Sequence, residues 1–149
     1  MNAPANAVRI LVAEDDADDR LLIRNAFEAS GMPGKLCFVN DGEELLDYLY
    51  RRGKYANGGS TDQPGIILLD LNMPKVDGRE ALKVIKNDDA LKRIPIVVLT
   101  TSNAEIDVVR SYDLGVNSFI TKPVTFDGLI KVVETLSKYW FDVVKLPTT

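Results

Sequence analysis

The sequence predicts an α/β protein in which a parallel β-sheet is covered by helices on both faces. Five short apolar segments rich in β-branched residues alternate with five segments of helical period along the 149 residues. Two of the strand segments, 66–69 and 96–99, are apolar at every position, which indicates strands that are buried on both faces. The strict alternation of strands and helices favours a doubly wound sheet.

The predicted elements follow one another in a regular order. Strands are expected at Val8–Ala13, Lys35–Val39, Ile66–Leu69, Ile96–Leu99 and Ser118–Thr121. The helical segments contain residues spaced to share one face: Leu21/Leu22/Asn25/Ala26/Ala29, Leu45/Leu46/Leu49, Ala81/Leu82/Ile85, Ile106/Val109/Leu114 and Leu129/Val132/Val133/Leu136. Capping residues support helix starts at Asn40/Asp41, Asp77 with Glu80, Ser102 with Glu105, and Thr125. The Gly- and Pro-containing stretch from Arg51 to Gly65 is interpreted as a long exposed loop, an insertion that the fold tolerates.

Length and charge narrow the class of protein. A chain of 149 residues is long enough for one domain, and 46% hydrophobic with 27% charged residues is typical of a soluble globular core. The net charge of -4 offers no basic surface for nucleic acid or anionic lipid. The apolar run Val8–Ala13 is too short for a signal sequence or a membrane span, so we expect a cytoplasmic protein with no membrane partner.

Missing residue types exclude several chemistries. The chain has no His and one Cys, which removes Ser-His-Asp and Cys-His catalytic groups, imidazole metal sites, Cys-x-x-Cys redox centres and any internal disulfide. The lone Cys37 lies between Leu36 and Phe38 and is expected to be a small core residue. Any bound metal ion must therefore be held by oxygen ligands.

Polar residues follow four of the predicted strands. In an open parallel sheet, ligands bind outside the carboxyl ends of the strands, near the point where the strand order reverses. The residues at these ends are Glu14, Asp15 and Asp16 after the first strand, Asp70 after the third, Thr100 and Thr101 after the fourth, and Lys122 and Pro123 after the fifth. The pattern predicts acids, a hydroxyl and an amine at one edge of the sheet.

Each of these residues alone has an ordinary structural role, as a helix cap, a turn residue, a strand end or a surface amine. Together they require another explanation, because two carboxylates about 4 Å apart repel by roughly 4 kcal/mol at an effective dielectric constant near 20. A divalent cation removes that repulsion. Mg²⁺ is expected, with Mn²⁺ as a substitute, because it prefers oxygen ligands and keeps several waters.

Other acidic and nucleotide-binding motifs are absent from the sequence. The segment Asp15–Arg20 lacks the turn Gly and the closing Glu of an EF-hand, and the chain contains neither of the glycine-rich loops that bind nucleotides. The remaining use of an Asp beside a metal ion is acceptance of a phosphoryl group.

These motifs, in this order and spacing, resemble the receiver domain of two-component response regulators. The resemblance runs from about Val8 to about Lys138 and is carried by Ile10–Asp16, Leu68–Pro74 with Asp77-Gly78, Val98–Thr101 and Phe119–Pro123. It implies a flavodoxin-like (βα)5 fold with five parallel strands in the order 2-1-3-4-5. It also implies one receiver domain over residues 1–149, with its core at about 8–138 and a helix extension and tail at about 139–149.

The resemblance implies roles for the acidic residues. Asp70 would accept the phosphoryl group and also contact the metal ion. Asp15 would bind Mg²⁺ directly, Glu14 would bind it through water, and Asn72 would offer its backbone carbonyl. Glu14 stands where Asp is more usual in the family, but it is still an oxygen ligand.

Three further positions complete the implied site. Lys122 would pair with Asp70 and then with the phosphoryl oxygens, helped by a cis bond to Pro123. Thr100 would move its hydroxyl onto the phosphoryl group. Phe119 would act as the aromatic switch, at a position where many members carry Tyr. These roles agree with phosphoryl transfer, which requires positioning and charge neutralisation more than covalent chemistry.

The resemblance also implies partners. Because the chain has no His, the phosphodonor would be the phosphohistidine of a histidine kinase, with small acyl phosphates as substitutes. The length leaves no room for a DNA-binding output domain. We therefore expect the signal to leave through protein contacts of the fourth helix, fifth strand and fifth helix, toward a target that the sequence does not identify.

The C-terminal segment Tyr139–Pro147 resembles the tail of single-domain regulators paired with bacterial phytochrome histidine kinases, a group that includes cyanobacterial members. The last predicted helix carries a core stripe and a second apolar set beside it. Since that second set has no partner in a monomer, it predicts a homodimer. The residues of the predicted interface are Ile130, Tyr139, Phe141 and Val144. The alternative is a tail that folds back on its own sheet.

Two other functions stay open. A Mg²⁺-dependent phosphohydrolase with an Asp nucleophile, of the haloacid dehalogenase kind, uses a second Asp two residues after the first, and this chain has Asn72 there. A pseudo-receiver would be a binding module without phosphorylation, although Asp15, Asp70, Thr100 and Lys122 are all present. We expect a phospho-acceptor with autophosphorylation and autodephosphorylation chemistry only, not an enzyme.

Overall fold

The computed structural model describes residues 8–31, 34–56, 63–71, 73, 75, 78–100, 118–121 and 125–138. For Val8, Thr100, Val132 and residues 118–121 and 135–138, the description is limited to the backbone. The helix expected around Ile106–Leu114, its capping pair, and the tail from residue 139 lie outside the described residues.

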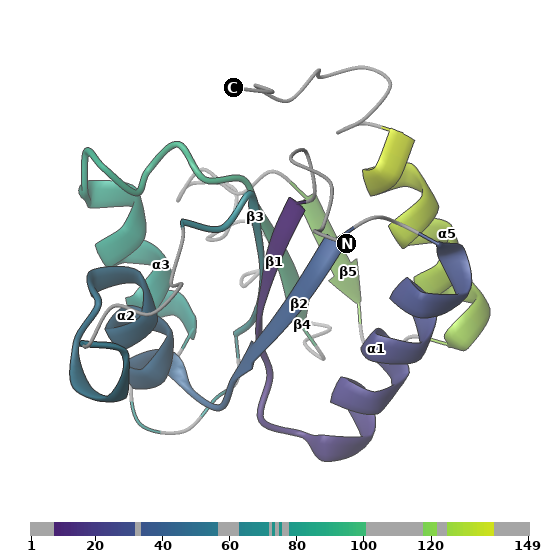
Figure 1. The fold of residues 1–149 in the computed structure, drawn as a ribbon, viewed down its shortest axis with the longest axis horizontal. Helices are drawn as coiled ribbons and strands as arrows, with labels where there is room; N and C mark the ends of the chain where they lie inside the picture. The colour runs from purple at the N-terminus through teal and green to yellow at the C-terminus, as the bar shows by residue number, and fades with distance from the viewer. Residues whose placement is uncertain are drawn as a thin grey trace, which may run out of the picture.

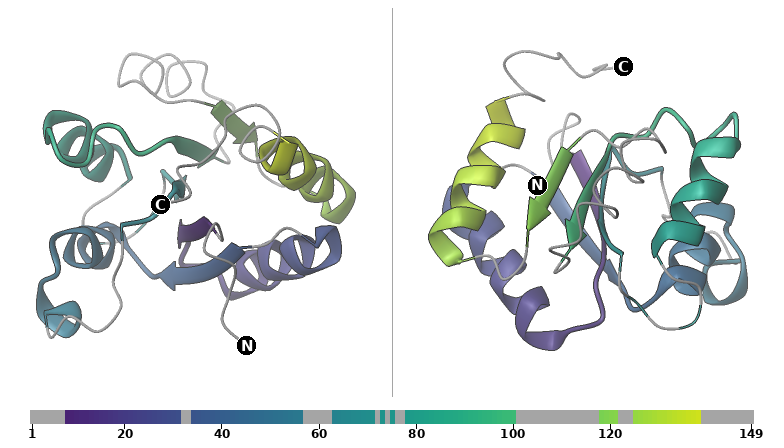
Figure 2. Two further views of the ribbon diagram at one scale, coloured as in Figure 1. Left: turned by 45° about the horizontal axis from the view of Figure 1, so that its top comes forward. Right: turned by 180° about the vertical axis from the view of Figure 1, so that it is seen from behind.

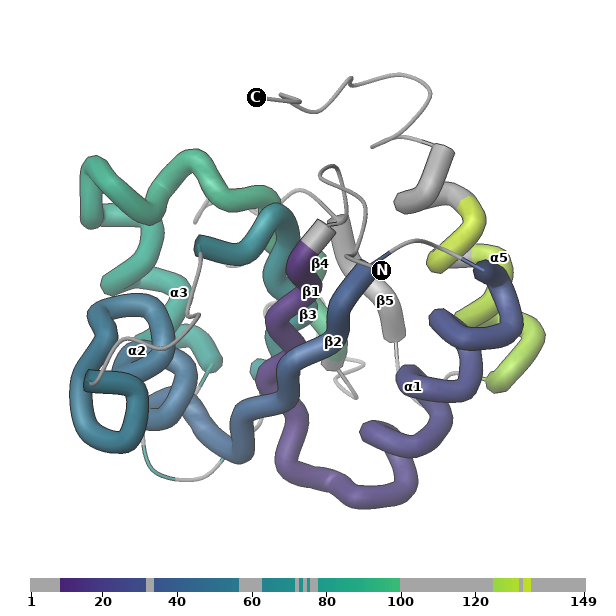
Figure 3. The backbone as a smooth tube through the Cα atoms, viewed as in Figure 1, coloured from purple at the N-terminus to yellow at the C-terminus, as the bar shows by residue number. Residues whose placement is uncertain are grey.

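The strands form one parallel sheet in the order β2-β1-β3-β4-β5 (Figure 1). Their bounds are β1 Val8–Ala13, β2 Gly34–Val39, β3 Ile66–Asp70, β4 Ile96–Thr100 and β5 Ser118–Thr121. The chain path in Figure 3 runs from β1 in the interior of the sheet outward to β2 and then back across to β3. The predicted strand order is confirmed, and each predicted strand differs from the observed one by at most one residue.

Helices cover both faces of the sheet. Helices α1 (Ala17–Ser30) and α5 (Phe126–Lys138) lie on one face, and α2 (Gly42–Tyr50) and α3 (Gly78–Asn87) lie on the other (Figures 1 and 2). The doubly wound architecture is therefore confirmed. None of the described helices is long and apolar enough to cross a membrane.

The alternation of side chains along the strands produces two hydrophobic cores. Odd-numbered residues of β1 and β3, such as Leu11 and Leu69, pack with α2 and α3. Even-numbered residues, such as Ile10 and Leu68, pack with α1 and α5. All residues of β3 are buried, which confirms the prediction of a strand covered on both faces.

The residues predicted to share one face of α1 only partly coincide with its buried face. Ala26 is buried and Leu22 is half-buried against the core, but Leu21 is 57% exposed. The buried face consists of Ile23, Ala26 and Phe27. Both sets have helical spacing, and the face with the larger core side chain, Phe27, is the one that packs on the sheet.

The first six residues of the loop predicted over Arg51–Gly65 are exposed, as predicted, except for the half-buried Tyr55, and they contain a short helix. Arg51 caps α2 with a left-handed backbone (φ 58°), and the short 3-10 helix η1 (Gly53–Tyr55) follows. The Tyr55 ring packs edge-on against Tyr48, with ring centroids 5.1 Å apart. The start of the predicted loop is therefore anchored to α2 by the Tyr55 ring.

Cys37 is half-buried at the border of the core on the α2 side. Its sulfur accepts weak hydrogen bonds from the Tyr48 hydroxyl at 3.9 Å and from Arg9 Nη1 at 4.0 Å. The interpretation of Cys37 as a small core residue therefore holds only in part.

Candidate functional site

The register of the sheet brings the predicted acids together. Strands β1 and β3 are neighbours, and Ala13 is paired with Leu69. Glu14 and Asp70 are the next residue of each chain segment, so they reach the same carboxyl edge side by side. The strand order reverses between β1 and β3, and this is where open α/β sheets bind ligands.

Three carboxylates form an acidic cluster at this edge. One oxygen each of Glu14, Asp15 and Asp70 lie within 4.8 Å of one another. Glu14 is 0% exposed and Asp70 is 4% exposed, whereas Asp15 is exposed. Because two of these groups are shielded from bulk water, their mutual repulsion is poorly screened. An oxygen-only donor set that is open on one side fits a hard divalent cation that retains waters.

Glu14 is held at three of its polar groups. Its backbone N–H donates to the Val39 carbonyl at 3.1 Å, which continues the contact between β1 and β2. Its carbonyl oxygen accepts a hydrogen bond from Arg20 Nε at 2.6 Å. Its side-chain Oε2 accepts from the Asp16 N–H at 3.1 Å. The Glu14 carboxylate is therefore fixed in the cluster by both backbone and side-chain contacts.

Asp16 has a different role from its two neighbours. It is the N-cap of α1, and its Oδ1 accepts hydrogen bonds from the N–H groups of Asp18 at 2.8 Å and Asp19 at 3.0 Å. These contacts satisfy two of the free N–H groups at the start of the helix. The structural interpretation of Asp16 is thus confirmed, and the acidic cluster does not include it.

The backbone around Asp70 is fixed on two sides. The Leu71 N–H donates to the Leu99 carbonyl at 3.1 Å, so the contact between β3 and β4 continues past Asp70. The Gly78 N–H donates to the Leu71 carbonyl at 3.1 Å and joins the start of α3 to the same segment. Asp70 is therefore carried by a rigid strand end and not by a free loop.

The fourth and fifth strands place two further predicted residues by their backbone. Asp70 is paired with Leu99, so Thr100 at the end of β4 lies one residue beyond the neighbour of Asp70. Thr100 is in turn paired with Thr121, the residue before Lys122. Phe119 lies in β5 opposite Val98. The sheet thus brings the segment before Lys122 to the same edge.

The remaining predicted residues divide into two groups. Ile130 is described, and it is half-buried against the core between α1 and α5, so only part of its side chain faces outward. The others lie outside the described residues: Asn72, Lys122, Pro123, Tyr139, Phe141 and Val144.

Sequence reasoning recognised the capping residue Asp41 but not its other contact. Its Oδ1 accepts from the Glu44 N–H at 2.7 Å, which confirms it as the N-cap of α2. Its Oδ2 lies 3.9 Å from Lys75 Nζ, which follows β3. The pair joins the segment after β3 to the start of α2, and no local pattern in the sequence signals it.

Glu44 is a second acid that sequence reasoning missed. Burial alone would raise the pKa of its carboxyl, but hydrogen bonds from Tyr55, Lys54 and the Asn40 N–H, with the charge of Lys54, lower it to about 2. The Tyr55 hydroxyl donates at 2.6 Å, and Lys54 Nζ lies at 2.9 Å. Glu44 therefore stays ionised and ties η1 to α2.

Sequence comparison with known proteins identifies the family that this chain matches and several relatives. Residues 10–134 match the response regulator receiver domain. Response regulator Rcp1 of Synechocystis sp. is 42% identical over 138 residues, which cover 93% of this chain and 92% of Rcp1. A probable methanogenesis regulatory protein, FilR2 of Methanothrix harundinacea, is 43% identical over 131 residues, covering 88% and 82% of the two chains.

Solved structures agree with the sequence relatives. The phosphorylated cyanobacterial phytochrome response regulator RcpA has a TM-score of 0.83 at 44% identity, covering 95% of this chain and 99% of RcpA. The Mn²⁺-bound form of Rcp1 has a TM-score of 0.81 at 41% identity, covering 94% and 99%. A divalent cation is thus bound by a regulator of the same fold.

Proposed function

The chain belongs to the response regulator receiver family of two-component signalling, and on that premise we propose that Asp70 accepts a phosphoryl group from a histidine kinase. The observation that carries this proposal is the position of Asp70. It is a buried carboxylate at a rigid strand end, and it shares the edge of the sheet with Glu14 and Asp15. A carboxylate in that position can act as a nucleophile toward phosphorus only if the charge around it is neutralised.

Mg²⁺ is the proposed neutralising ion, with Mn²⁺ as a substitute. Asp15, Asp70 and the Asn72 carbonyl would bind it directly, and Glu14 would bind it through water. When bound, the ion supplies charge neutralisation for the phosphoryl oxygens and for the three carboxylates. The oxygen-only donor set and the Mn²⁺ in Rcp1 support this assignment.

The reaction proposed for this site is a single transfer. A carboxylate oxygen of Asp70 forms a bond to phosphorus while the bond between phosphorus and the kinase histidine nitrogen breaks. Lys122 and the Thr100 hydroxyl would contact the phosphoryl oxygens, and Phe119 would follow the movement of Thr100. The chain is then a substrate of the kinase and a switch, not an enzyme with turnover.

A phytochrome histidine kinase is the proposed partner. Solved relatives include the phytochrome regulator RcpA, and the tail motif Tyr139–Pro147 points to the same group. FilR2, a probable methanogenesis regulatory protein, is equally similar in sequence, so the kinase class needs its own test. Transfer profiling against purified kinases should show fastest labelling by a phytochrome kinase, and equal labelling by unrelated kinases would contradict this assignment. We propose that the chain meets this kinase in the cytoplasm.

Acyl-phosphate labelling tests the function itself. Incubation with acetyl phosphate and Mg²⁺, followed by intact-mass measurement, should give one phosphate adduct on the wild type and none on Asp70→Asn. Asp89→Asn is the matched control, because Asp89 is an exposed carboxylate outside the cluster, and its Oδ1 lies 2.9 Å from Lys92 Nζ. It should be labelled like the wild type.

The same experiment separates the alternatives. No adduct on the folded wild type, under conditions that label a known receiver, would leave the pseudo-receiver as the explanation. Steady release of phosphate from a small phosphomonoester, abolished in Asp70→Asn, would instead indicate a phosphohydrolase.

A homodimer through α5 and the tail is the proposed assembly. Ile130, Tyr139, Phe141 and Val144 would form its interface. Sedimentation equilibrium over a range of concentrations should give the mass of two chains, and Phe141→Lys should give one. A wild-type monomer at tens of micromolar, phosphorylated or not, rejects the dimer.

A further inference from the structure

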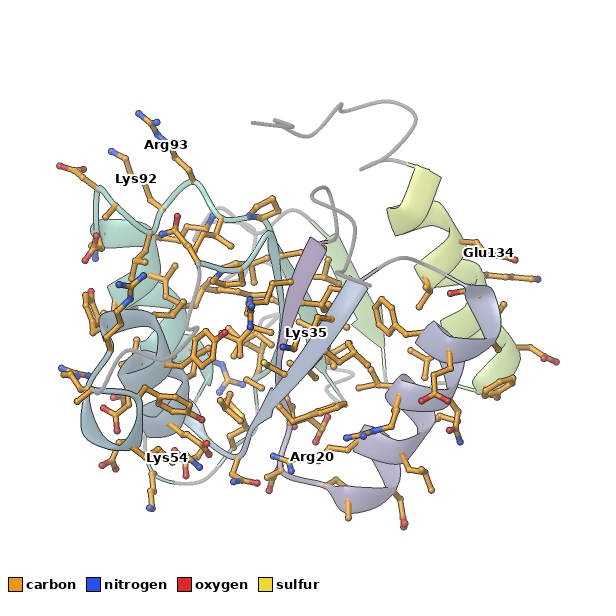
Figure 4. All side chains as sticks on the ribbon, viewed as in Figure 1. Arg20, Lys35, Lys54, Lys92, Arg93 and Glu134 are labelled. Atoms are coloured by element: carbon orange, nitrogen blue, oxygen red, sulfur yellow. The ribbon has the colours of Figure 1, made fainter. Side chains whose placement is uncertain are left out.

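Arg20 contacts the acidic cluster without belonging to it. Its Nε donates to the Glu14 carbonyl oxygen at 2.6 Å, and its Nη2 donates to Asn40 Oδ1 at 2.5 Å. Figure 4 shows Arg20 at the lower edge of the molecule, between α1 and α2. One guanidinium therefore joins α1, the segment after β1 and the segment after β2.

The orientation of Asn40 is fixed from its other side. Its backbone N–H and its side-chain Nδ2 both donate to Glu44 Oε1, each at 2.9 Å. Because the amide nitrogen faces a carboxylate, the amide oxygen must face the guanidinium of Arg20. Glu44 and Arg20 thus require the same orientation of the Asn40 side-chain amide.

Glu44 is held in turn by η1. Its Oε2 accepts from the Tyr55 hydroxyl at 2.6 Å and lies 2.9 Å from Lys54 Nζ. Its side chain is 14% exposed. Polar contacts therefore run without a break from η1 through Glu44, Asn40 and Arg20 to the backbone of Glu14.

The geometry at Arg20 requires an arginine. Two nitrogens of one planar group serve two acceptors on different segments, whereas a lysine offers one compact ammonium that cannot span both. Arg24, one turn later on α1, provides a comparison within the same helix. Both guanidiniums lie over the Phe38 ring, at 5.5 Å for Arg20 and 5.1 Å for Arg24, but the hydrogen bonds to Glu14 and Asn40 come from Arg20.

We propose that Arg20 is a positioning residue for the acidic cluster, holding the Glu14 backbone so that the Glu14 carboxylate stays beside Asp15 and Asp70. The proposal rests on the proposed function, namely that the cluster binds a divalent cation. Groups that orient metal ligands typically change metal affinity 10- to 100-fold when they are removed. Arg20 acts through a backbone carbonyl, so a weakening of about 10-fold is expected.

A charge effect of Arg20 and a positioning role of Arg20 predict opposite changes in metal affinity when the residue is replaced. A guanidinium near the cluster repels a dication, so if charge were its main effect, removing it would tighten metal binding. If Arg20 positions Glu14, removing it weakens metal binding even though a positive charge is lost. The sign of the change therefore separates the two roles.

The experiment is a Mn²⁺ titration in which electron paramagnetic resonance measures the free ion, with Mg²⁺ as a competitor. Arg20→Lys keeps the positive charge but loses the guanidinium that bonds two acceptors. Arg20→Met loses both the charge and the guanidinium while keeping an apolar stem over Phe38. Arg24→Lys and Arg24→Met are the matched controls. Urea unfolding of each variant measures stability separately, so that a folding defect is not mistaken for a change in the site.

Both Arg20 variants should bind Mn²⁺ about 10-fold more weakly than the wild type, and both Arg24 variants should bind it equally well. Unchanged binding in Arg20→Lys with tighter binding in Arg20→Met would overturn the proposal and leave a charge effect. Equal weakening in the Arg20 and Arg24 variants would overturn it in favour of a general effect of α1. A wild type that binds neither ion would instead contradict the proposed function.

Discussion

Gly78, the first residue of α3, lies directly against the backbone of Asp70. A Cβ atom at Gly78 would be 2.4 Å from the Asp70 carbonyl oxygen and 2.6 Å from the Leu71 Cα. Backbone atoms cannot move aside as the end of a side chain can. The position of the proposed acceptor is therefore coupled to the absence of a side chain on a different element.

Gly78→Ala should destabilise the fold and disturb the site together. Forcing a methyl group into this contact costs about 1–3 kcal/mol, and the strand end that carries Asp70 must shift to admit it. Urea unfolding should show the loss of stability, and Mn²⁺ titration should show weaker binding.

Gly31→Ala is the control for that change. Gly31 ends α1 with a left-handed backbone (φ 69°). Apart from Gly31 itself and its chain neighbours, no atom of the described residues lies within 4 Å of the position of its missing Cβ. The substitution should cost about 1–2 kcal/mol through backbone strain alone and leave metal binding unchanged. A Gly78→Ala variant that is as stable as the wild type and binds Mn²⁺ equally well contradicts the coupling.

A divalent cation should stabilise the folded chain. The carboxylates of Glu14, Asp15 and Asp70 come together only in the folded sheet, so the ion binds the folded state in preference to the unfolded one. At 100 times the dissociation constant, the free energy of unfolding should rise by about 2.7 kcal/mol. Thermal unfolding with Mg²⁺ and with a chelator measures this difference.

Asp15→Asn should reduce both the repulsion among the three carboxylates and the stabilisation of the fold by Mg²⁺. Without metal the variant should be at least as stable as the wild type, because one member of a mutually repelling set is neutral. With Mg²⁺ it should gain less stability than the wild type. Equal stabilisation of the two proteins by Mg²⁺ would place the ion elsewhere.

Glu44→Gln should change how stability depends on pH. The folded-state pKa of about 2 lies below the ordinary value of 4.5, so the ionised Glu44 contributes stability above about pH 4.5. That contribution is lost as the pH falls from about 4.5 to about 2. The variant should be less stable than the wild type at pH 7, and the difference should shrink over that range. Urea unfolding at several pH values tests it, and a gap that does not change with pH counts against this account.

Tyr50→Phe should raise the pKa of Asp88 toward its ordinary value. The hydrogen bond from the Tyr50 hydroxyl, 2.6 Å from Asp88 Oδ2, is the main cause that lowers the pKa of this carboxyl, with further help from the N–H groups of Ala90 and Leu91. Carbon-13 NMR titration of the Asp88 carboxyl measures the shift. Tyr55→Phe removes a hydroxyl bound to another acid and should leave Asp88 unchanged.

Local sequence patterns predicted the strands because each strand contains its own signal. The segments Ile66–Leu69 and Ile96–Leu99 are apolar throughout, and that property alone requires cover on both faces. The meeting of Glu14 with Asp70 followed from the ends of parallel strands and from the family resemblance. The structure confirms this meeting through the pairing of Ala13 with Leu69.

Local sequence patterns did not predict the features that depend on partners distant in sequence, such as the buried face of a helix or a side-chain contact between segments. Two faces of α1 have helical spacing, and packing against the sheet selects the face with Phe27. The contact from Arg20 to Asn40 spans 20 positions, and it exists because β1 and β2 are neighbours. The sequence places Tyr55 in an exposed loop, but its side chain is half-buried against Glu44 and Tyr48. These partners lie on a helix whose orientation no local pattern predicts.

Strand β1 precedes the others in the chain, yet it has a neighbour along each of its edges. Its residues from Ile10 to Ala13 are completely buried in the finished domain. On the ribosome, these residues emerge long before β3 has been translated, and at roughly 5–20 residues per second the delay is about 3 to 10 seconds. Throughout that interval the nascent polypeptide therefore carries an apolar strand that lacks the partner for one of its edges, and the order of synthesis sets how long this lasts.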